Sequence, residues 1–425
     1  MATPAIAKRR DSRAEDTQNL LADAVIAVVA EVGMSRLTHR RVAAAGGVSL
    51  SATTYHYKTK ADMLADASQR LLDGYIQRFR AIAQDSRSGA RPAFTLAELC
   101  TRIVLNAADR ERIPTLAWCE IMLDAARSPE GHAIARHWYA DLQDAWSEVA
   151  QALGQDAAQQ RLSCMIDMVV GLLFVTRGLR LDRNEIAAAE TGASLETAWR
   201  LDSGPDGGIS RAAPKSRKSA ATRERLLQAT IELLVEGGAG AASYAAIAER
   251  SGEALTAPAY HFGNISGLLK QAETRMFRES KDRYREVLAD SRRGSRSAKA
   301  LADVTAAIFV REATRFRPET IAHYSIWLEA ARDPLLRPDI AASVGDQLAA
   351  WQRRLAPVCG GTGHDALACQ AMFVGALVRA VSTGAGAETK AGIHGQFREL
   401  FGLIATHPKN GTFFQIFLPP GAANA

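Results

Sequence analysis

The sequence repeats itself after 205 residues, and no other feature constrains the fold as strongly. Residues 20–64 align without a gap with residues 225–269, and 12 of these 45 positions are identical. At the same offset, residues 116–129 and 321–334 share seven of 14 positions. This period is longer than the units of about 20–50 residues from which solenoids are built. We therefore expect two copies of one whole domain, fused in a single chain.

The composition favours helices. Apolar residues make up 47% of the chain and aromatic residues only 6%, and no alternating β-branched segment interrupts the alanine- and leucine-rich stretches. This pattern predicts an all-α fold. No apolar run reaches the roughly 18 residues of a membrane span, and no apolar core follows the charged N-terminus. The five cysteines form no CxxC pair. We expect a cytoplasmic, nucleoid-associated protein with reduced cysteines and no membrane partner.

Periodicity and its breaks divide the chain into seven predicted segments. They are a disordered basic arm (1–16), a first helix-turn-helix domain (17–64), a first helical regulatory domain (65–201), a linker (202–219), a degenerate second helix-turn-helix domain (220–269), a second helical regulatory domain (270–407) and a C-terminal tail (408–425). The repeated AAR-x-P motif at 125–129 and 330–334 is predicted to end a helix.

Residues 38–57 have the pattern of a helix-turn-helix, with Thr38 as N-cap of the first helix, Gly46-Gly47 as the turn and Ser49 or Ser51 as the next cap. Five Lys or Arg and no Asp or Glu lie between residues 36 and 60, a net charge of +5 that suits a polyanion. A solvated helical hairpin would explain the charge alone, but the spacing favours DNA binding. The predicted contacts are Thr38, Arg40, Arg41, Ser49, Ser51, Thr53, Thr54, Tyr55, His56, Lys58 and Lys60.

This spacing resembles the TetR family of one-component transcriptional regulators. The family pattern is matched at Gly33, Thr38, Val42-Ala43, Gly47-Val48-Ser49, His56-Tyr57, Lys60 and Leu64. The resemblance implies a TetR-like three-helix head followed by a helical ligand-binding and dimerisation bundle in each copy. It also implies that Thr38 and Lys60 meet phosphates and that Arg40 reaches a base. Thr54 stands where members usually have tyrosine, so that phosphate contact is expected either to be weakened or to be taken over by Tyr55.

The second copy is not equivalent to the first. Residues 241–265 carry a net charge of −1, and the counterparts of Arg40 and Lys60 are Ala245 and Ile265. Pro258 is acceptable only in the first turn of a short helix capped by Thr256. A basic stretch from Arg211 to Arg225 either follows a phosphate backbone or is a solvated linker. Weaker DNA contacts are predicted for Thr256, Tyr260 and His261.

The resemblance implies that residues 94–200 and 301–404 enclose a small-molecule effector. Candidate pocket residues are Trp118, Met122, Trp138, Phe174, Tyr324 and Trp327. Aromatic residues at helical spacing are more often ordinary core, and this alternative stays open. The histidines form no HxxxH or HxxE pair, and the phosphate-loop, nucleophile-elbow and zinc-protease motifs are absent from the sequence. We expect no metal, no cofactor and no enzymatic activity.

The sequence therefore predicts a DNA-binding transcriptional regulator, a repressor released by a small-molecule effector. The alternative is a ligand- or protein-binding helical scaffold with only non-specific affinity for double-stranded DNA. The two copies form either an intramolecular pseudo-dimer or one half of a homodimer of whole chains, and the sequence does not choose between these arrangements.

Overall fold

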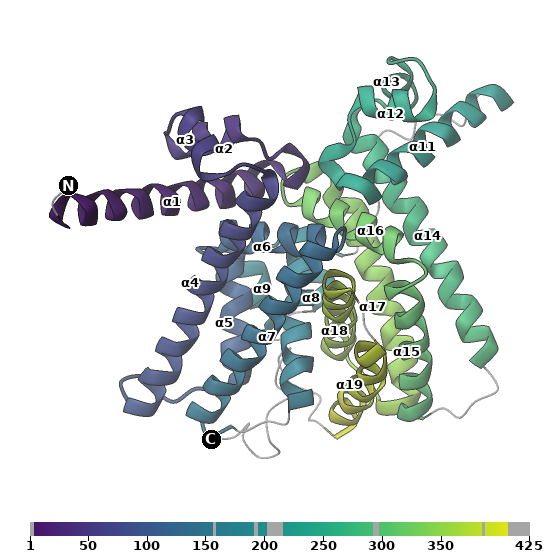
Figure 1. Ribbon diagram of the computed structural model, residues 1–425. Helices are drawn as coiled ribbons and strands as arrows, with labels where there is room; N and C mark the ends of the chain where they lie inside the picture. The colour runs from purple at the N-terminus through teal and green to yellow at the C-terminus, as the bar shows by residue number, and fades with distance from the viewer. Residues whose placement is uncertain are drawn as a thin grey trace.

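The computed structural model describes residues 4–155, 159–190, 194–201, 216–291, 297–384 and 387–406. Within these ranges it contains nineteen α-helices, three short 3-10 helices and no strand, which confirms the all-α prediction. The two heads lie at the top of Figure 1, α1–α3 on the left and α11–α13 on the right, and the helical bundles of both copies lie below them.

The two copies contain corresponding series of helices. The first copy has α1 (Pro4–Val32), η1 (Met34–Arg36), α2 (His39–Gly46), α3 (Leu50–His56), α4 (Lys60–Ser88), α5 (Leu96–Ala107), α6 (Arg112–Ala125), α7 (Pro129–Ala152), α8 (Gln159–Gly178), α9 (Arg183–Glu190) and α10 (Leu195–Ala198). The second copy has α11 (Arg217–Gly237), η2 (Ala239–Ala241), α12 (Tyr244–Ser251), α13 (Ala257–Phe262), α14 (Ile265–Ser291), α15 (Ala298–Ala313), α16 (Arg317–Ala330), η3 (Pro334–Leu336), α17 (Arg337–Cys359), α18 (Gly363–Thr383) and α19 (Ala387–Thr406).

Helix α1 extends further than the sequence pattern indicates. It begins at Pro4, so the prediction of a disordered arm is wrong for residues 4–16, which continue the helix. The prediction relied on apolar periodicity, which starts only at Thr17. A helix continues beyond its packed part when the residues are good helix formers, as the alanines and arginines of this segment are.

Two other predicted segments fall mainly outside the described residues. These are the C-terminal tail, 408–425, and the linker up to residue 215. Helix α11 begins at Arg217 after the N-cap Ser216, so the last three residues of the predicted linker are helical.

The apolar side of α1 connects the first head to the first bundle. Leu21, Val25 and Val29 are fully buried, and α1 packs against α2 and α4 as well as against α6. In the second copy α11 packs in the same way against α12, α14 and α16. Each head is therefore seated directly on the bundle of its own copy.

The two copies are joined by the crossing of α8 and α18, the most extensive contact between any two helices of the described chain. A Cβ atom on Gly171 would lie 1.7 Å from the carbonyl oxygen of Ala371, and one on Gly375 would lie 1.7 Å from that of Asp167. Only glycine permits such a close approach of two backbones. These glycines occupy equivalent positions in the two copies, so the crossing has local two-fold symmetry in its backbone.

The side chains at this crossing are not symmetric. Arg379 of α18 donates to both carboxylate oxygens of Asp167 in α8, at 2.8 and 2.7 Å, and Asp167 is fully buried. The equivalent positions are occupied by Val175 and Ala371. The crossing therefore contains one such buried ion pair. The pair can form only between a first copy, which supplies Asp167, and a second copy, which supplies Arg379.

Helix α18 is the one described helix that is long and apolar enough to cross a membrane. In this fold 89% of the most apolar 18-residue stretch of α18 is buried inside the protein. Its composition is therefore explained by its position between the two bundles, where it packs against α8, α7 and α17.

Candidate nucleic-acid interface and ligand cavities

The first head has the predicted helix-turn-helix. The Thr38 hydroxyl accepts a hydrogen bond from the Arg41 N–H at 3.3 Å, and the Ser49 hydroxyl accepts one from the Ala52 N–H at 3.1 Å. Gly47, with φ of 62°, ends α2 in the left-handed conformation that glycine adopts readily. The predicted caps and turn are confirmed. A capping hydroxyl still has its own proton, which it can donate to a phosphate oxygen.

Most of the predicted contact residues are exposed, but Thr53 is not. Thr53 is fully buried and its hydroxyl donates to the Leu50 carbonyl at 2.7 Å, so its prediction as a DNA contact is wrong. Thr54 lies on the exposed side of α3, where its hydroxyl is bonded to the carbonyls of Leu50 and Ser51. Tyr55 is 82% exposed and its ring packs edge-on against His56. It is therefore the most available hydroxyl of α3.

The basic side chains of the first head are not neutralised within the protein. Arg40, Arg41, Lys58 and Lys60 are exposed, and none forms an ion pair with another residue in the described ranges. Buried and exposed carboxylates elsewhere are largely paired with arginines, so this face is unusual within the molecule. Four free cations around one helix-turn-helix form a surface that attracts a polyanion.

The N-terminus of α4 is already partly occupied by a carboxylate. Asp62 accepts from the Lys58 and Thr59 N–H groups at 3.0 and 2.8 Å in a capping box, and these bonds hold its pKa below the usual value. The predicted phosphate site at Lys60 therefore depends on the Lys60 ammonium more than on the helix N-terminus.

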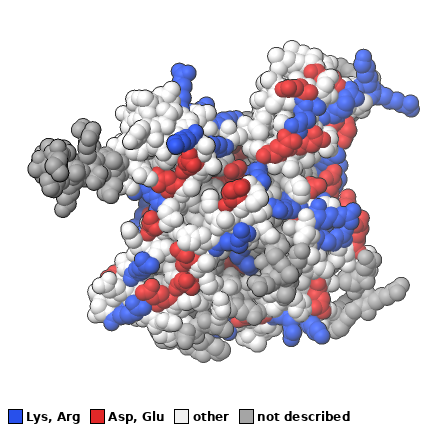
Figure 2. Space-filling view, viewed as in Figure 1, with Lys and Arg blue, Asp and Glu red and all other residues white. Residues whose placement is uncertain are grey.

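The second head uses its charges internally. Arg225 pairs with Glu253, and Arg250 donates to both carboxylate oxygens of Glu236 at 2.9 and 2.7 Å. Arg223 donates to the carbonyl of His261 and lies 4.4 Å from the centre of the Phe262 ring. In the face shown in Figure 2, acidic side chains accordingly lie beside the basic ones on this head. Arg223 and Arg225, the last two residues of the basic stretch before the second copy, therefore stabilise the head itself.

The third helix of the second head is short, as Pro258 requires. Helix α13 begins at Ala257 and Pro258 falls in its first turn, which confirms that part of the prediction. Thr256 occupies the N-cap position, but its side chain makes no capping hydrogen bond, so the predicted cap is wrong. Its backbone is in the right-handed helical region, which points the hydroxyl away from the N–H groups it would cap. Tyr260 remains 73% exposed, like Tyr55.

Two equivalent arginines connect each bundle to the head of the other copy. Arg127, just after α6, donates to the carbonyls of Val235 and Leu234 at the end of α11, at 3.1 and 3.4 Å. Arg332, just after α16, donates to the carbonyls of Ala30 and Val29 at the end of α1, at 2.9 and 3.1 Å. The AAR-x-P motif does lie at a helix end, but its arginine caps a different helix in the other copy.

We call each of these arginines, Arg127 and Arg332, a clamp. The two clamps differ in their surroundings. Arg332 also contacts Glu120 at 2.7 Å and Glu329 at 3.2 Å, and all three side chains are nearly buried. Arg127 contacts the single, more exposed carboxylate of Asp124 at 3.2 Å. The clamp on the first head is therefore the more deeply buried of the two.

Each bundle contains a cavity. The first cavity, of about 220 Å³, lies among α4 to α8, and its walls include Phe79, Trp118, Trp138 and Trp146. Four arginines and one glutamate complete its charged lining: Arg78, Arg91, Arg102, Arg110 and Glu111. Trp138 and Trp146 donate to Ser68 and Tyr75, but the buried Trp118 N–H has no hydrogen-bond partner among the described residues. This lining suits an apolar molecule with an acceptor or anionic group.

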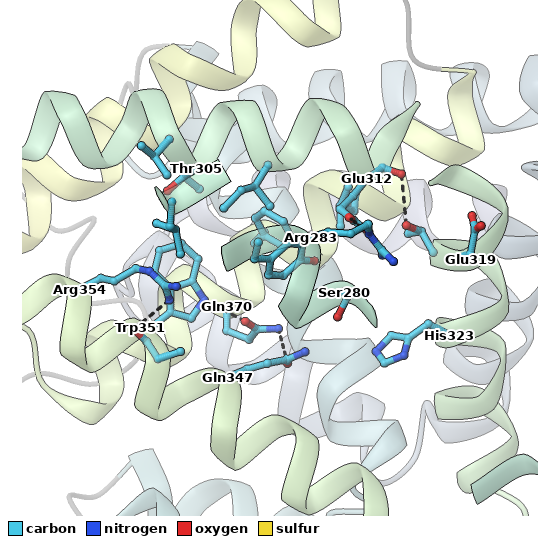
Figure 3. A pocket seen from close by; sticks show the side chains of 18 of the residues that line it. Ser280, Arg283, Thr305, Glu312, Glu319, His323, Gln347, Trp351, Arg354 and Gln370 are labelled. Atoms are coloured by element: carbon cyan, nitrogen blue, oxygen red, sulfur yellow. Dashed lines mark hydrogen bonds and ion pairs between the residues drawn. The ribbon is translucent and has the colours of Figure 1, made fainter. Parts of the chain in front are cut away.

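The second cavity, of about 100 Å³, lies among α14 to α18, and its lining includes acidic, amide and imidazole side chains (Figure 3). Arg283 and Glu312 form a closed pair with both N–O distances at 2.9 Å. Trp351 donates to Gln370, and Gln370 donates to Gln347, at 2.9 and 2.7 Å. A row of ordered polar groups therefore runs along one wall.

The structure places three of the six predicted pocket residues at a cavity. Trp118 and Trp138 line the first cavity, and Tyr324 lines the second. Met122, Phe174 and Trp327 line neither cavity; they are fully buried core residues, so their prediction as pocket residues is wrong. Helical spacing identifies the inward side of a helix, but it does not tell which inward residues meet a cavity and which meet another helix.

A family model described as the tetracyclin repressor-like C-terminal domain matches residues 91–200 and 296–403, just over half of the chain. The chain belongs to the TetR family. TetR-family proteins are transcriptional regulators, and they are generally not enzymes. A search of curated proteins finds no match to this chain.

The two matched regions contain equivalent structural features of the two copies. Each region includes much of one cavity lining and one clamp arginine, Arg127 or Arg332. Both heads lie outside the matched regions, so their TetR character rests on the helix-turn-helix itself. The chain is thus a TetR-family protein with two TetR-type C-terminal domains in tandem.

Proposed function

We propose that the chain is a sequence-specific DNA-binding regulator, and that it is a repressor released by a small-molecule effector. The observation that carries the proposal is the contrast between the heads: four free cations surround the first helix-turn-helix, whereas the arginines of the second are paired internally. Each phosphate neutralised by a free cation releases counterions and adds affinity. We infer that the first head supplies most of the affinity and that the second makes a weaker contact.

We infer that a single chain occupies the operator as an intramolecular pseudo-dimer. The support is the buried pair of Asp167 and Arg379. If two first copies paired in a homodimer, each Asp167 would face Val175 and remain charged and buried without a partner. That arrangement is strongly unfavourable. A pair made of one first copy and one second copy satisfies both charges.

The clamps support a route by which an effector changes DNA binding. A ligand in either cavity contacts α6 or α16, and each of these helices leads directly into the arginine that caps a helix of the other head. A ligand that favours a different position of either helix then lowers the population in which both heads fit the operator.

Footprinting on genomic DNA around the gene, with light-scattering mass of the free and bound protein, tests the proposal. We expect a discrete, asymmetric footprint covered by one chain. A palindromic footprint covered by two chains would overturn the pseudo-dimer but keep the DNA-binding role. Weak binding to every duplex, with no discrete footprint, would favour the alternative of a scaffold with non-specific affinity.

Replacing Lys60 with alanine is expected to weaken binding to all duplexes. The exposed ammonium is assigned to a phosphate, so its loss should make the slope of log K against log salt shallower by about 0.9. Titration at several salt concentrations measures this slope. Arg285→Ala removes an equal charge from an exposed position on α14 and serves as the control. An unchanged slope in Lys60→Ala would remove Lys60 from the interface.

Replacing Arg40 with alanine is expected to relax sequence preference at one operator position. A base contact by arginine discriminates by about 1–3 kcal/mol, whereas a phosphate contact does not discriminate. Competition with operators substituted one position at a time measures the preference. If Arg40→Ala lowers affinity equally for all of them, Arg40 binds the backbone, and if neither Arg40→Ala nor Lys60→Ala has an effect, the assignment of the first head is wrong.

A further inference from the structure

The two cavities are built from the same positions of the duplicated domain. Phe79 and Tyr284, for example, are equivalent, and so are Trp146 and Trp351; all four line their cavities. Differences between the two linings therefore record how the same site has changed in each copy.

The differences run in both directions, since Arg102 and Glu111 of the first lining correspond to Ala307 and Phe316. The larger set of changes gives the second copy the more polar residue. Four positions that line both cavities are apolar or indole in the first copy and carry an acid, an amide or an imidazole in the second: Pro114 and Glu319, Trp118 and His323, Leu142 and Gln347, Ile166 and Gln370. Two more polar residues of the second lining, Glu312 and Arg354, replace Ala107 and Val149. A cavity with six additional polar groups at these positions selects a different class of ligand from its counterpart in the first copy.

Two of the four ionisable groups that are new in the second lining are paired with neighbouring side chains. Arg283 and Glu312 satisfy each other, and His323 contacts Glu273 at 3.0 Å. Two charged groups are left without an ion pair among the described residues. Glu319 has a buried carboxylate oxygen with no hydrogen-bond partner, and the half-buried Arg354 donates only to the carbonyl of Ala350. A buried charge without a partner is costly, so both groups favour a ligand that supplies one.

The two free charges lie at opposite sides of the second cavity, Arg354 on the left and Glu319 on the right of Figure 3, with Gln347 between them. The Gln347 oxygen accepts from Gln370, which leaves its NH₂ group as a donor without a partner in the described part of the chain. The cavity thus offers a cation and an amide donor on one side and a carboxylate on the other. Its volume of about 100 Å³ admits only a small molecule.

We propose that the second cavity binds a small zwitterion, whose ammonium group pairs with Glu319 and whose carboxylate pairs with Arg354 and the Gln347 amide. The first cavity instead takes an apolar ligand that carries an acceptor or anionic group, so the chain responds to two chemically different effectors. This inference rests on the proposed function for its regulatory meaning, but the binding itself does not depend on DNA.

Calorimetric titration of the full chain with α,ω-amino acids of increasing length, from glycine to 6-aminohexanoate, tests the proposal. We expect at least one member of the series to bind at one site per chain. Butylammonium and butyrate, which carry one charge each, should bind at least tenfold more weakly. If no member of the series binds at millimolar concentration, or if the singly charged compounds bind equally well, the proposal is wrong.

Substitutions of lining residues show which of the two cavities binds the zwitterion. Glu319→Gln and Arg354→Met should each weaken zwitterion binding at least tenfold, whereas Glu111→Gln, which removes a carboxylate from the first cavity, should leave it unchanged. An unchanged near-ultraviolet circular dichroism spectrum and thermal unfolding temperature show that the variants remain folded. Zwitterion binding that survives both Glu319→Gln and Arg354→Met would overturn the proposal. The titrations contain no DNA, so their failure and the failure of the footprint are separate results.

Discussion

Replacing Asp167 with alanine is expected to lower the free energy of unfolding by about 3–5 kcal/mol. The substitution leaves Arg379 nearly buried between α8 and α18 without its counter-charge, and the carboxylate it loses is fully buried. Urea unfolding followed by tryptophan fluorescence measures the change, and the slope with urea shows whether the two copies still unfold together.

Two further variants give this prediction its controls. The double variant Asp167→Ala/Arg379→Met removes both charges and should recover most of the lost stability, because an apolar pair of similar size can replace a buried ion pair. Asp282→Ala removes a carboxylate from an exposed pair and should change stability by about 0–1 kcal/mol. A loss below about 1 kcal/mol in Asp167→Ala would mean that the ion pair does not hold the copies together.

The ends of helices were the part of the fold that the sequence predicted best. Thr38, Ser49 and Gly47 act through neighbours within four residues, so a local pattern contains all the information needed. The start of α1 was missed for the opposite reason, because residues 4–16 are helical without an apolar periodicity that marks them.

Contacts between distant residues could not be predicted from the sequence. Asp167 and Arg379 are 212 positions apart, and each is the single charge in an otherwise largely apolar stretch of its helix, residues 162–176 and 366–383. Arg127 and Arg332 were correctly placed at helix ends, but a local pattern cannot reveal that each side chain reaches the other copy. The repeat did show that Arg127 and Arg332 occupy equivalent positions, because they are 205 residues apart.

For the first head and the cavities, the sequence indicated the correct region of the fold, but it did not identify every residue that faces the surface or the cavity. Thr53 has the same chemistry as its exposed neighbour Thr54, but it lies on the inward side of α3. Likewise, Met122 and Trp118 both face inward from α6, and only Trp118 meets the cavity. Deciding such cases requires the packing of several helices at once.

The second large effect is expected from Arg332→Met, which should cost about 3–5 kcal/mol of stability. The variant leaves Glu120 and Glu329 close together and nearly buried, and it removes two hydrogen bonds from the C-terminal carbonyls of α1. Below the unfolding transition, we also expect weaker operator binding, because the first head loses its contact with the second bundle. Chemical unfolding and DNA titration measure the two effects separately.

Arg127→Met is the matched control, since it removes the equivalent clamp from the other head. We expect it to cost about 1–3 kcal/mol, because only Asp124 loses a partner and that carboxylate is more exposed. Arg332→Lys should restore little, since an ammonium group cannot reproduce the fork that reaches two carbonyls and two carboxylates. Equal losses in the two methionine variants would contradict the difference in burial between the clamps.

The close crossing at Gly171 and Gly375 has a consequence for how the protein responds to its own abundance. A repressor made of two separate chains falls apart when scarce, and the number of active dimers then rises with the square of the number of molecules. Here both crossing helices belong to one polypeptide, so each newly made molecule already contains its pair. On the proposed function, operator occupancy then rises in direct proportion to the amount of protein, and a cell holding only a few copies keeps a working switch.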